Sequence, residues 1–276
     1  MAISAKEVNE LRKMTGAGMM DCKKALVEAD GDYDKAIELL RKKGQKVSAS
    51  RSDRETTEGV VVVKTNDDQT EGTLITLTCE TDFVAKNVDF VALANEILEA
   101  AYANKPADIE AIKALPAGNI TVGEKIIENI GKIGEKLEIT AYETLSADQV
   151  VPYIHAGSKL GVLVGLSNTN GSDQTEAGKD VAMQIAAMNP IALDKDGVDE
   201  SIVAKEIEIG KEQARAEGKP EQILEKIAMG KLNKFYKENT LLSQVFVKDN
   251  SVNISQYLDG VSKGMTVSAF KRIAIG

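Results

Sequence analysis

The residues of this chain that could carry chemistry are few, and the densest group lies between positions 79 and 83. Glu80 and Asp82 stand on either side of Thr81, and Phe83 follows directly. Carboxylates can act as general acids and bases, so an enzyme that uses scattered acidic residues of this kind is one hypothesis. His155 is the single histidine, and no nucleophile motif lies near it. A multi-histidine metal site is therefore excluded, and we expect no catalytic residue, no metal ion and no cofactor.

A glycine-rich segment near the N-terminus has some features of a phosphate-binding loop. Residues 15–20 read TGAGMM. Phosphate loops follow a buried strand and carry a third glycine or end in Gly-Lys-Ser/Thr, whereas this segment follows the polar, helix-like residues 7–14. We therefore expect a turn between two helices. The adjacent Met19 and Met20 cannot both point into one helix face, so at least one should be partly exposed. It would serve as an adaptable apolar contact or pack against the rest of the chain.

The composition is that of a soluble globular protein. Of its 276 residues, 43% are apolar and 28% charged, which is enough for two or three domains with cores of their own. The net charge of −9 argues against a general nucleic-acid binder and leaves a protein partner open. No apolar stretch is long enough to span a membrane, and the N-terminus lacks a signal peptide, so we expect a cytoplasmic protein. Cys22 and Cys79 lie in apolar surroundings, which indicates buried free thiols.

A strand and a helix should position Phe83. Residues 73–77 alternate in the manner of a strand, and Thr81 is a good helix N-cap. A helix should follow, because apolar residues recur at helical spacing at Val84, Val88 and Val91. Phe83 would then fall in the first turn, near the surface. The ring could pack as a hydrophobic staple or against the core, or it could be held out for a partner.

Residues 1–44 should form a compact head of three helices. Ser4 and Glu7 fit a capping box at the start of the first helix. The third helix should end at residues 42–44 (KKG), where two cations and a glycine favour a C-terminus. So small a core makes a catalytic pocket improbable and favours a docking role. Residues 45–57 carry almost no apolar side chains and should form a linker, helical in part.

The body of the chain is built from two similar halves. Residues 58–145, the core N-subdomain, and residues 146–276, the core C-subdomain, each contain two β segments, helical segments and a final strand. We therefore expect an α+β protein in which each half is an antiparallel sheet of three strands with helices on one face. An insertion at 197–238 contains two amphipathic segments joined at residues 218–220, which should form an antiparallel helical hairpin. The hairpin could mediate self-association or a partner contact, or pack internally.

Three motifs give the chain a resemblance to a known family. They are residues 11–26 (LRKMTGAGMMDCKKAL), residues 81–86 (TDFVAK), and residues 153–157 (YIHAG) before residues 161–164 (GVLV). Together they resemble the bacterial elongation factor Ts family over essentially the whole chain. The resemblance implies a guanine-nucleotide exchange factor of translation elongation, which binds elongation factor Tu and releases its GDP. It also implies a ubiquitin-associated-like (UBA-like) head, a duplicated core and a protruding coiled-coil hairpin, through which a homodimer or heterotetramer could form. No direct contact with nucleic acid or membrane is expected.

The resemblance also implies which residues contact elongation factor Tu. Asp82 and Phe83 match a pair that pushes into the nucleotide-binding domain near its magnesium site, and Thr81 and Val84 flank that pair in the motif. The remaining contacts that it implies are made by Arg12, Met19 and Met20 of the head, and by His155 and the Phe246-Val247 stretch of the second half.

The chain departs from the family pattern at two places. It stops at Gly276 directly after the last expected strand, without the additional C-terminal helix that some members use against the partner, so we expect that contact to be missing. Lys248 follows Val247 where an apolar residue is usual. The alternative hypothesis is a UBA-type adaptor or scaffold protein without exchange activity.

Overall fold

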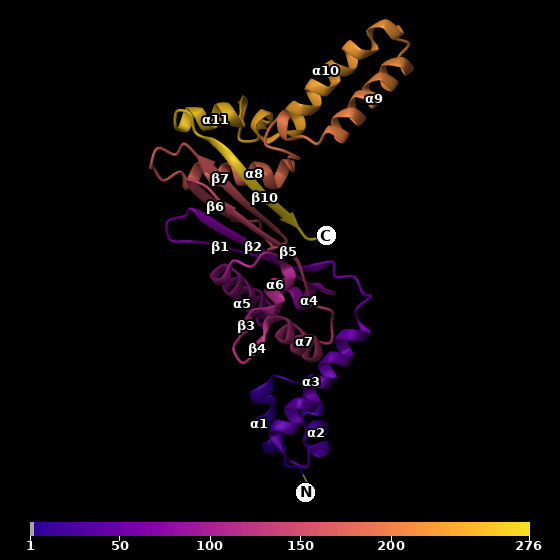
Figure 1. Cartoon of the computed structure of the whole chain (residues 1–276), viewed down its shortest axis with the longest axis vertical. Helices are drawn as coiled ribbons and strands as arrows, with labels where there is room; N and C mark the ends of the chain where they lie inside the picture. The colour runs from indigo at the N-terminus through magenta and orange to yellow at the C-terminus, as the bar shows by residue number, and fades with distance from the viewer. Residues whose placement is uncertain (1–2) are drawn as a thin grey trace.

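Three helices form the N-terminal end of the molecule. The computed structural model describes residues 3–276, and Figure 1 shows these helices as a separate bundle below the body. The Ser4–Glu7 capping box begins the first helix as predicted, and Gly16, with a φ of 68°, ends it. Leu11, Cys22 and Leu26 are fully buried in the bundle core. The helices are α1 (Ala5–Thr15), α2 (Met19–Glu28) and α3 (Tyr33–Ser50).

The prediction that the third helix ends at residue 44 was wrong. Helix α3 continues to Ser50 and therefore takes up the first half of the expected linker. Gly44 is not a C-cap but a point of close approach to α7 (Val122–Ile133), because a Cβ atom on Gly131 would lie 2.8 Å from the Gly44 Cα atom. The glycine is required by packing between helices, and the lysines before it lie on the surface of an uninterrupted helix.

Two antiparallel sheets form the body, as the sequence predicted. Within residues 3–276 the three-stranded sheets have the orders β1-β2-β5 and β10-β7-β6, so each half of the chain contributes a hairpin and a later third strand. The strands are β1 (Glu58–Thr65), β2 (Glu71–Cys79), β5 (Glu138–Ser146), β6 (Gln149–Ile154), β7 (Leu160–Ser167) and β10 (Thr266–Ala274). Helices α5 (Val88–Asn104) and α7 cover the first sheet, and α8 (Thr175–Met188) and α11 (Ile254–Val261) cover the second.

The faces of the sheets that carry no helices pack against each other. Val61 and Leu74 of the first sheet meet Val150 and Leu163 of the second in one buried cluster. A Cβ atom on Gly161 would lie 2.4 Å from the Val61 side chain, so this interface needs glycine at one point. The layers therefore run helix, sheet, sheet, helix (Figure 1). This stacking buries both faces of β2, in which all but the first residue is buried.

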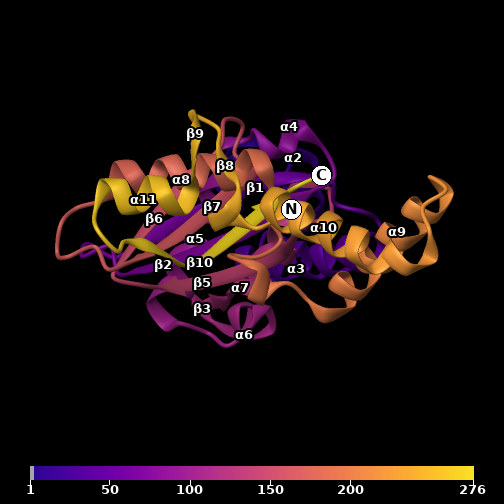
Figure 2. The ribbon, with the colours of Figure 1, turned by 90° about the horizontal axis from the view of Figure 1, so that it is seen from above.

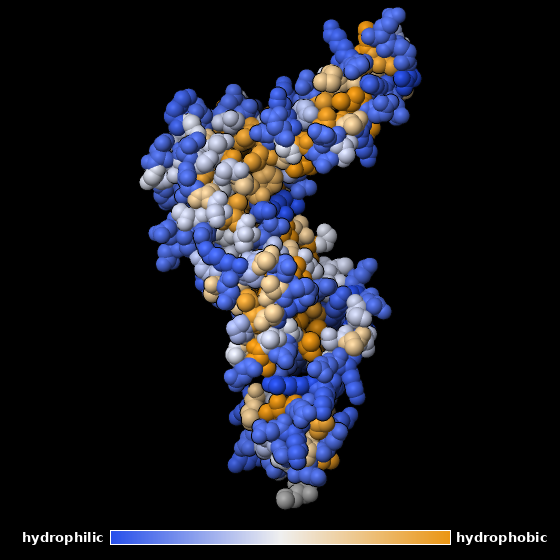
Figure 3. All heavy atoms as spheres, in the orientation of Figure 1, coloured by the Kyte–Doolittle hydropathy of each residue, from blue (hydrophilic) through white to orange (hydrophobic). Residues whose placement is uncertain are grey.

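A pair of long helices projects from the second half. Figures 1 and 2 show α9 (Glu200–Ala216) and α10 (Glu221–Asn239) extending beyond the sheets, and Figure 3 shows apolar side chains gathered along them. The two helices touch closely, because a Cβ atom on Gly210 would lie 3.0 Å from the Ala228 Cα atom. Leu224 and Leu232 are buried in the pair. Among the described residues, 3–276, no helix is both long and apolar enough to cross a membrane.

Short elements complete the chain. They are α4 (Asp82–Ala85), α6 (Ile109–Ala114), β3 (Pro116–Ala117), β4 (Ile120–Thr121), two 3-10 turns, η1 (Lys195–Gly197) and η2 (Leu241–Ser243), β8 (Val245–Phe246) and β9 (Asp249–Asn253).

Candidate functional site

Phe83 is the most exposed large apolar side chain of the body. It belongs to α4, a single turn that follows β2, and 83% of its surface is accessible. Thr81 caps this turn, since its hydroxyl accepts a hydrogen bond from the backbone N–H of Val84. Val84 and Ala85 pack on the core of the first half, and the ring points away from it. The interpretation of Phe83 as a staple or core residue is therefore wrong. The ring is exposed, and its contact with a partner stays a prediction.

Val88 does not continue a helix that contains Val84. Asn87 caps a new helix, α5, with its side chain, and Val88 at the first position of that helix is 80% exposed. The prediction of one helical stripe through residues 84, 88 and 91 was wrong because the chain changes direction at Asn87. Val88 instead adds a second exposed apolar side chain five positions after Phe83.

Asp82 is ionised beside the exposed ring. Its carboxylate accepts a hydrogen bond from the Lys86 ammonium at 2.7 Å, and this bond is the main cause that lowers the pKa of Asp82. Both side chains are partly exposed, so the pair is weak in water and can be exchanged for a charged or polar partner group. The turn therefore presents a carboxylate and a ring next to each other on the surface.

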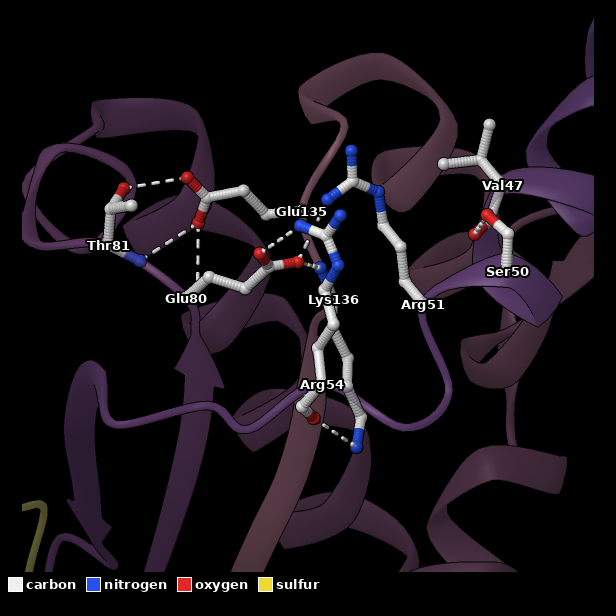
Figure 4. A network of polar contacts seen from close by, with 8 residues as sticks. All are labelled: Val47, Ser50, Arg51, Arg54, Glu80, Thr81, Glu135 and Lys136. Carbon is white, nitrogen blue, oxygen red and sulfur yellow. Dashed lines mark hydrogen bonds and ion pairs between the residues drawn. The ribbon is translucent and has the colours of Figure 1, made fainter.

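Two further carboxylates hold the turn from behind (Figure 4). Glu135 accepts hydrogen bonds from the backbone N–H groups of Glu80 and Thr81, at 3.1 and 3.0 Å, and from the Thr81 hydroxyl at 2.7 Å. Glu80 in turn accepts a hydrogen bond from the backbone N–H of Lys136 at 2.7 Å. Its carboxylate also accepts hydrogen bonds from the guanidinium groups of Arg51 and Arg54. The sequence singled out Glu80 only as a candidate for acid–base chemistry, and it gave no signal for Glu135 or for the two arginines.

The electrostatics of Glu80 fit this structural role. Burial acts to raise its pKa, but hydrogen bonds from Lys136, Arg54 and Arg51 outweigh burial and lower it. The side chain is 16% exposed, so the carboxylate is charged and largely enclosed by its donors. Glu80 is therefore a structural anchor and has no free oxygen for acid–base chemistry.

His155 lies on the same end of the two-sheet body as Phe83. It is exposed in the turn between β6 and β7, and its Nδ1 atom is 2.9 Å from the Tyr153 hydroxyl. The next residues of this turn bind β1, since the N–H of Val61 donates to the Ser158 carbonyl and Lys159 lies 2.5 Å from Glu58. Because Glu58 pairs with Cys79 in the first sheet, the His155 turn and the Phe83 turn are neighbours.

The head residues Arg12, Met19 and Met20 lie on a surface of their own. All three are exposed, and the two methionines have 52% and 63% of their surface accessible, so the expectation of at least one exposed methionine is confirmed. Met14, at 63%, adds to the apolar surface and was not predicted. The head is separated from α4 by the α3–α7 contact, so these side chains form a second exposed region (Figure 1).

In the second half of the chain, Val247 is exposed on the surface and Phe246 is buried. Phe246 is 3% exposed and stacks on Tyr257 with 4.3 Å between ring centroids, so the expected contact of Phe246 with a partner is wrong. Val247 and Val245 are about half exposed on either side of it. Gln184 fixes this segment from inside, because its side-chain oxygen accepts from the Val247 N–H at 2.9 Å.

The exposed residues form protrusions and not a pocket. A cavity of about 230 Å³ lies between the head and α7. An open hollow of about 620 Å³ lies beside the Phe83 turn and is lined in part by Val84 and Asn87, but Phe83 does not line it. Residues 3–276 contain no cluster of three His, Cys, Asp or Glu side chains that could hold a metal ion. Exposed apolar side chains in three separate regions of an elongated body are typical of the class of proteins that bind other proteins.

Comparison with known proteins specifies the family. The model of the family described as Elongation factor TS matches residues 80–276. The chain is 61% identical to Elongation factor Ts of Cytophaga hutchinsonii, over 99% of both chains, and 58% identical to that of Amoebophilus asiaticus over 100% of both. It is 47% identical to that of Porphyromonas gingivalis, over 100% of this chain and 99% of the relative. The chain belongs to the elongation factor Ts family, whose members are nucleotide exchange factors of protein biosynthesis. This supports the exchange-factor hypothesis over the adaptor.

Proposed function

We propose that this chain binds GDP-loaded elongation factor Tu and releases the GDP by pressing Asp82 and Phe83 into the partner near its magnesium and phosphate site. The observation that carries the proposal is the 83% exposure of Phe83 on an anchored turn. An exposed ring that contributes nothing to its own core gains free energy only by burial in another molecule. The factor itself would catalyse no chemical reaction, and it would act in the cytoplasm, where translation elongation takes place.

Burial of the Phe83 ring alone cannot supply the free energy needed to accelerate nucleotide release. Lowering the barrier to nucleotide release enough for a roughly ten-thousandfold acceleration requires about 5.5 kcal/mol. Burying one phenylalanine contributes about 1.5–3 kcal/mol. Contacts elsewhere must therefore contribute binding energy that is used to distort the pocket of the partner.

Two other exposed regions fit this requirement. In the proposal, Arg12, Met19 and Met20 bind the same domain of the partner as the Phe83 turn, with methionine as an adaptable apolar contact. Val247 and His155 bind from the second half, and Thr81 and Val84 support the central contact. Figure 1 shows the head, the α4 turn and the second half distributed along the long axis, so the partner would be contacted over a long span.

Thermodynamic linkage completes the cycle. If the factor weakens nucleotide binding to elongation factor Tu, then nucleotide must weaken binding of the factor by the same ratio. Fresh nucleotide would therefore displace the chain from the complex. No metal or cofactor of the chain's own is needed, because the magnesium ion in question belongs to the partner.

The division of the chain into domains belongs to the same proposal. The head would be a UBA-like module, followed by a short linker, a core N-subdomain to about residue 145 and a core C-subdomain that contains α9 and α10. We propose that these two helices act as a coiled-coil hairpin through which a homodimer or heterotetramer forms. The mass of the complex with elongation factor Tu, with and without GDP, tests stoichiometry and linkage together, and a mass of one copy of each chain contradicts hairpin-mediated assembly.

Nucleotide release from elongation factor Tu loaded with fluorescent GDP tests the central contact. Phe83→Ala and Asp82→Ala should each reduce the acceleration, because one removes the apolar wedge and the other its charged neighbour. Val261→Ala is the matched control, since Val261 is 46% exposed at the end of α11 and lies outside all three contact regions. Unchanged acceleration in both test variants would remove the Phe83 turn from the mechanism.

A further inference from the structure

The turn that carries Phe83 is fixed by residues far from it in the sequence. Helix α4 has four residues, too few to be stable alone, so its position depends on tertiary contacts. We propose that Glu135 is a positioning residue for nucleotide release: its carboxylate sets the direction in which Phe83 is presented. This inference rests on the proposed function and adds a residue that contacts neither nucleotide nor partner.

The geometry joins Glu135 to α4 through Thr81. One carboxylate oxygen of Glu135 accepts from the N–H groups of Glu80 and Thr81, and the other accepts from the Thr81 hydroxyl. The same hydroxyl accepts from the N–H of Val84 in the first turn of α4. Both oxygens of Glu135 are therefore occupied by this turn, and the hydrogen bonds run from the loop before β5 directly into the helix that carries the ring.

The attachment is reciprocal. Glu135 holds the backbone of Glu80, and Glu80 holds the backbone of Lys136 at 2.7 Å. Arg51, directly after α3, and Arg54, four residues past its end, both pair with Glu80. Charge-assisted hydrogen bonds of this kind are the strong ones in proteins, and several on one turn leave it a single orientation. The base of the Phe83 turn is thus tied to the first sheet and to the end of the head helix.

The orientation of the Phe83 ring should affect the rate of GDP release more than it affects the affinity of the chain for its partner. A ring on a loose turn could still be buried by the partner, but part of the binding energy would be used to order the turn and less would act on the magnesium pocket. Loss of the Glu135 carboxylate should therefore lower the release rate at saturating factor, with a smaller effect on the concentration that gives half of the maximal rate.

The experiment compares four proteins: the unmodified chain, Glu135→Gln, Phe83→Ala and the double variant. Release of fluorescent GDP from elongation factor Tu is measured over a range of factor concentrations. Glu135→Gln keeps the size of the side chain but replaces one accepting oxygen with an amide NH2, and should lower the saturating rate about tenfold, as expected for loss of charge-assisted hydrogen bonds. In the Phe83→Ala background the same substitution should have a much smaller effect, because the ring that Glu135 orients is absent and only Asp82 remains on the turn.

Glu143→Gln on β5 is the matched control. Glu143 pairs with Lys271 at 2.6 Å, away from the turn, and its substitution should leave both kinetic quantities unchanged. Equal losses from Glu135→Gln in both backgrounds, or no loss in either, would overturn the inference. If Phe83→Ala alone leaves release unchanged, the proposed function fails instead, so the two failures are distinguishable.

A second pair of variants covers the case in which Glu135→Gln does not fold. Thr81→Val removes the hydroxyl that links Glu135 to α4, whereas Thr81→Ser retains it. The saturating rate should fall clearly further with valine than with serine. Equal rates for the two variants, with melting temperatures that match, would contradict a positioning path through Thr81.

Discussion

Gly44 of α3 and Gly131 of α7 lie in direct backbone contact, and this contact sets the position of the head on the body. A Cβ atom on Gly131 would lie 2.8 Å from the Gly44 Cα atom, and one on Gly44 would lie 3.1 Å from the Ile127 carbonyl oxygen. An ion pair flanks the crossing, since Arg41 lies 2.9 Å from Glu128. Because α3 also ends next to the arginines that bind Glu80, the head and the Phe83 turn are connected through one rigid helix.

Gly131→Ala should therefore destabilise the protein although alanine favours helices. The intrinsic gain is up to about 1 kcal/mol, but the added methyl group must push two helix backbones apart, which typically costs about 1–3 kcal/mol. Gly230→Ala in α10 is the matched control, since its Cβ would meet no atom within 4 Å, and it should raise stability. Thermal unfolding followed by circular dichroism checks both, and a rise in melting temperature for both variants would refute close packing at the crossing.

Phe83 and Phe90 should respond in opposite ways to removal of the ring. Phe83→Ala should change the free energy of unfolding by less than about 0.5 kcal/mol, because the ring is mostly in water. Phe90 is fully buried in α5, so Phe90→Ala should cost about 3–5 kcal/mol. Urea unfolding of the two variants measures the difference. A large loss for Phe83→Ala would mean that the ring supports its own fold, which contradicts a role reserved for a partner.

Local patterns were enough to predict much of the fold and the exposed residues. The β segments and the Ser4 cap depend on residues within one element, so period and capping rules identify them. The motif around Phe83 indicated a surface ring because Thr81 begins a helical turn there. Both buried cysteines are free, as their surroundings predicted.

The wrong or missing predictions concern residues whose structural role depends on a contact with another residue far away in the sequence. Gly44 carries the local signal of a helix end, but its role is set by Gly131. Glu135 is separated by 55 positions from the backbone N–H of Glu80 that it binds, so no spacing rule connects them. Phe246 matched a contact position in the motif, but the ring of Tyr257 retains it in the core. Tertiary packing and long-range hydrogen bonds therefore determine what local sequence cannot.

Glu80 should make stability depend on acid pH. Its pKa is lowered in the folded protein, so its contribution is fully present above the unfolded value of about 4.3 and is lost as the pH falls through the lower folded value. Glu80→Gln should cost about 1–3 kcal/mol at pH 7, and the difference from the unmodified protein should shrink as the pH falls below about 4. Urea unfolding at pH 7, 5 and 3.5 measures the difference. If the two proteins differ in free energy of unfolding by the same amount at every pH, the charge of Glu80 does not contribute to stability.

Cys79 should be inert in the folded protein. Burial, with the negative charge of Glu135 as a second cause, raises the pKa of its thiol to about 12. At pH 8 only about one molecule in ten thousand would then carry the reactive thiolate. Ellman's reagent should react with neither Cys79 nor the buried Cys22 until the protein is unfolded. Rapid reaction of one thiol in the native protein would indicate that its region opens readily.

Gln184 should hold the Val245–Val247 segment as Glu135 holds the Phe83 turn. The side chain is fully buried on α8, and its amide donates to the Val245 carbonyl and the Gln244 side chain while its oxygen accepts from the Val247 N–H. Gln184→Met keeps the volume but leaves these groups without partners, which should cost about 2–4 kcal/mol.

Hydrogen exchange separates a local effect of Gln184→Met from a global one. The Val247 amide should exchange faster than expected from the loss of overall stability, because its acceptor is gone. Gln213→Met is the matched control, since Gln213 makes its hydrogen bond to Lys231 on the exposed hairpin surface and supports no buried segment. If the Val247 amide keeps its protection in Gln184→Met, the segment is held by β9 and Tyr257 alone, and its exposed valines need no support from α8.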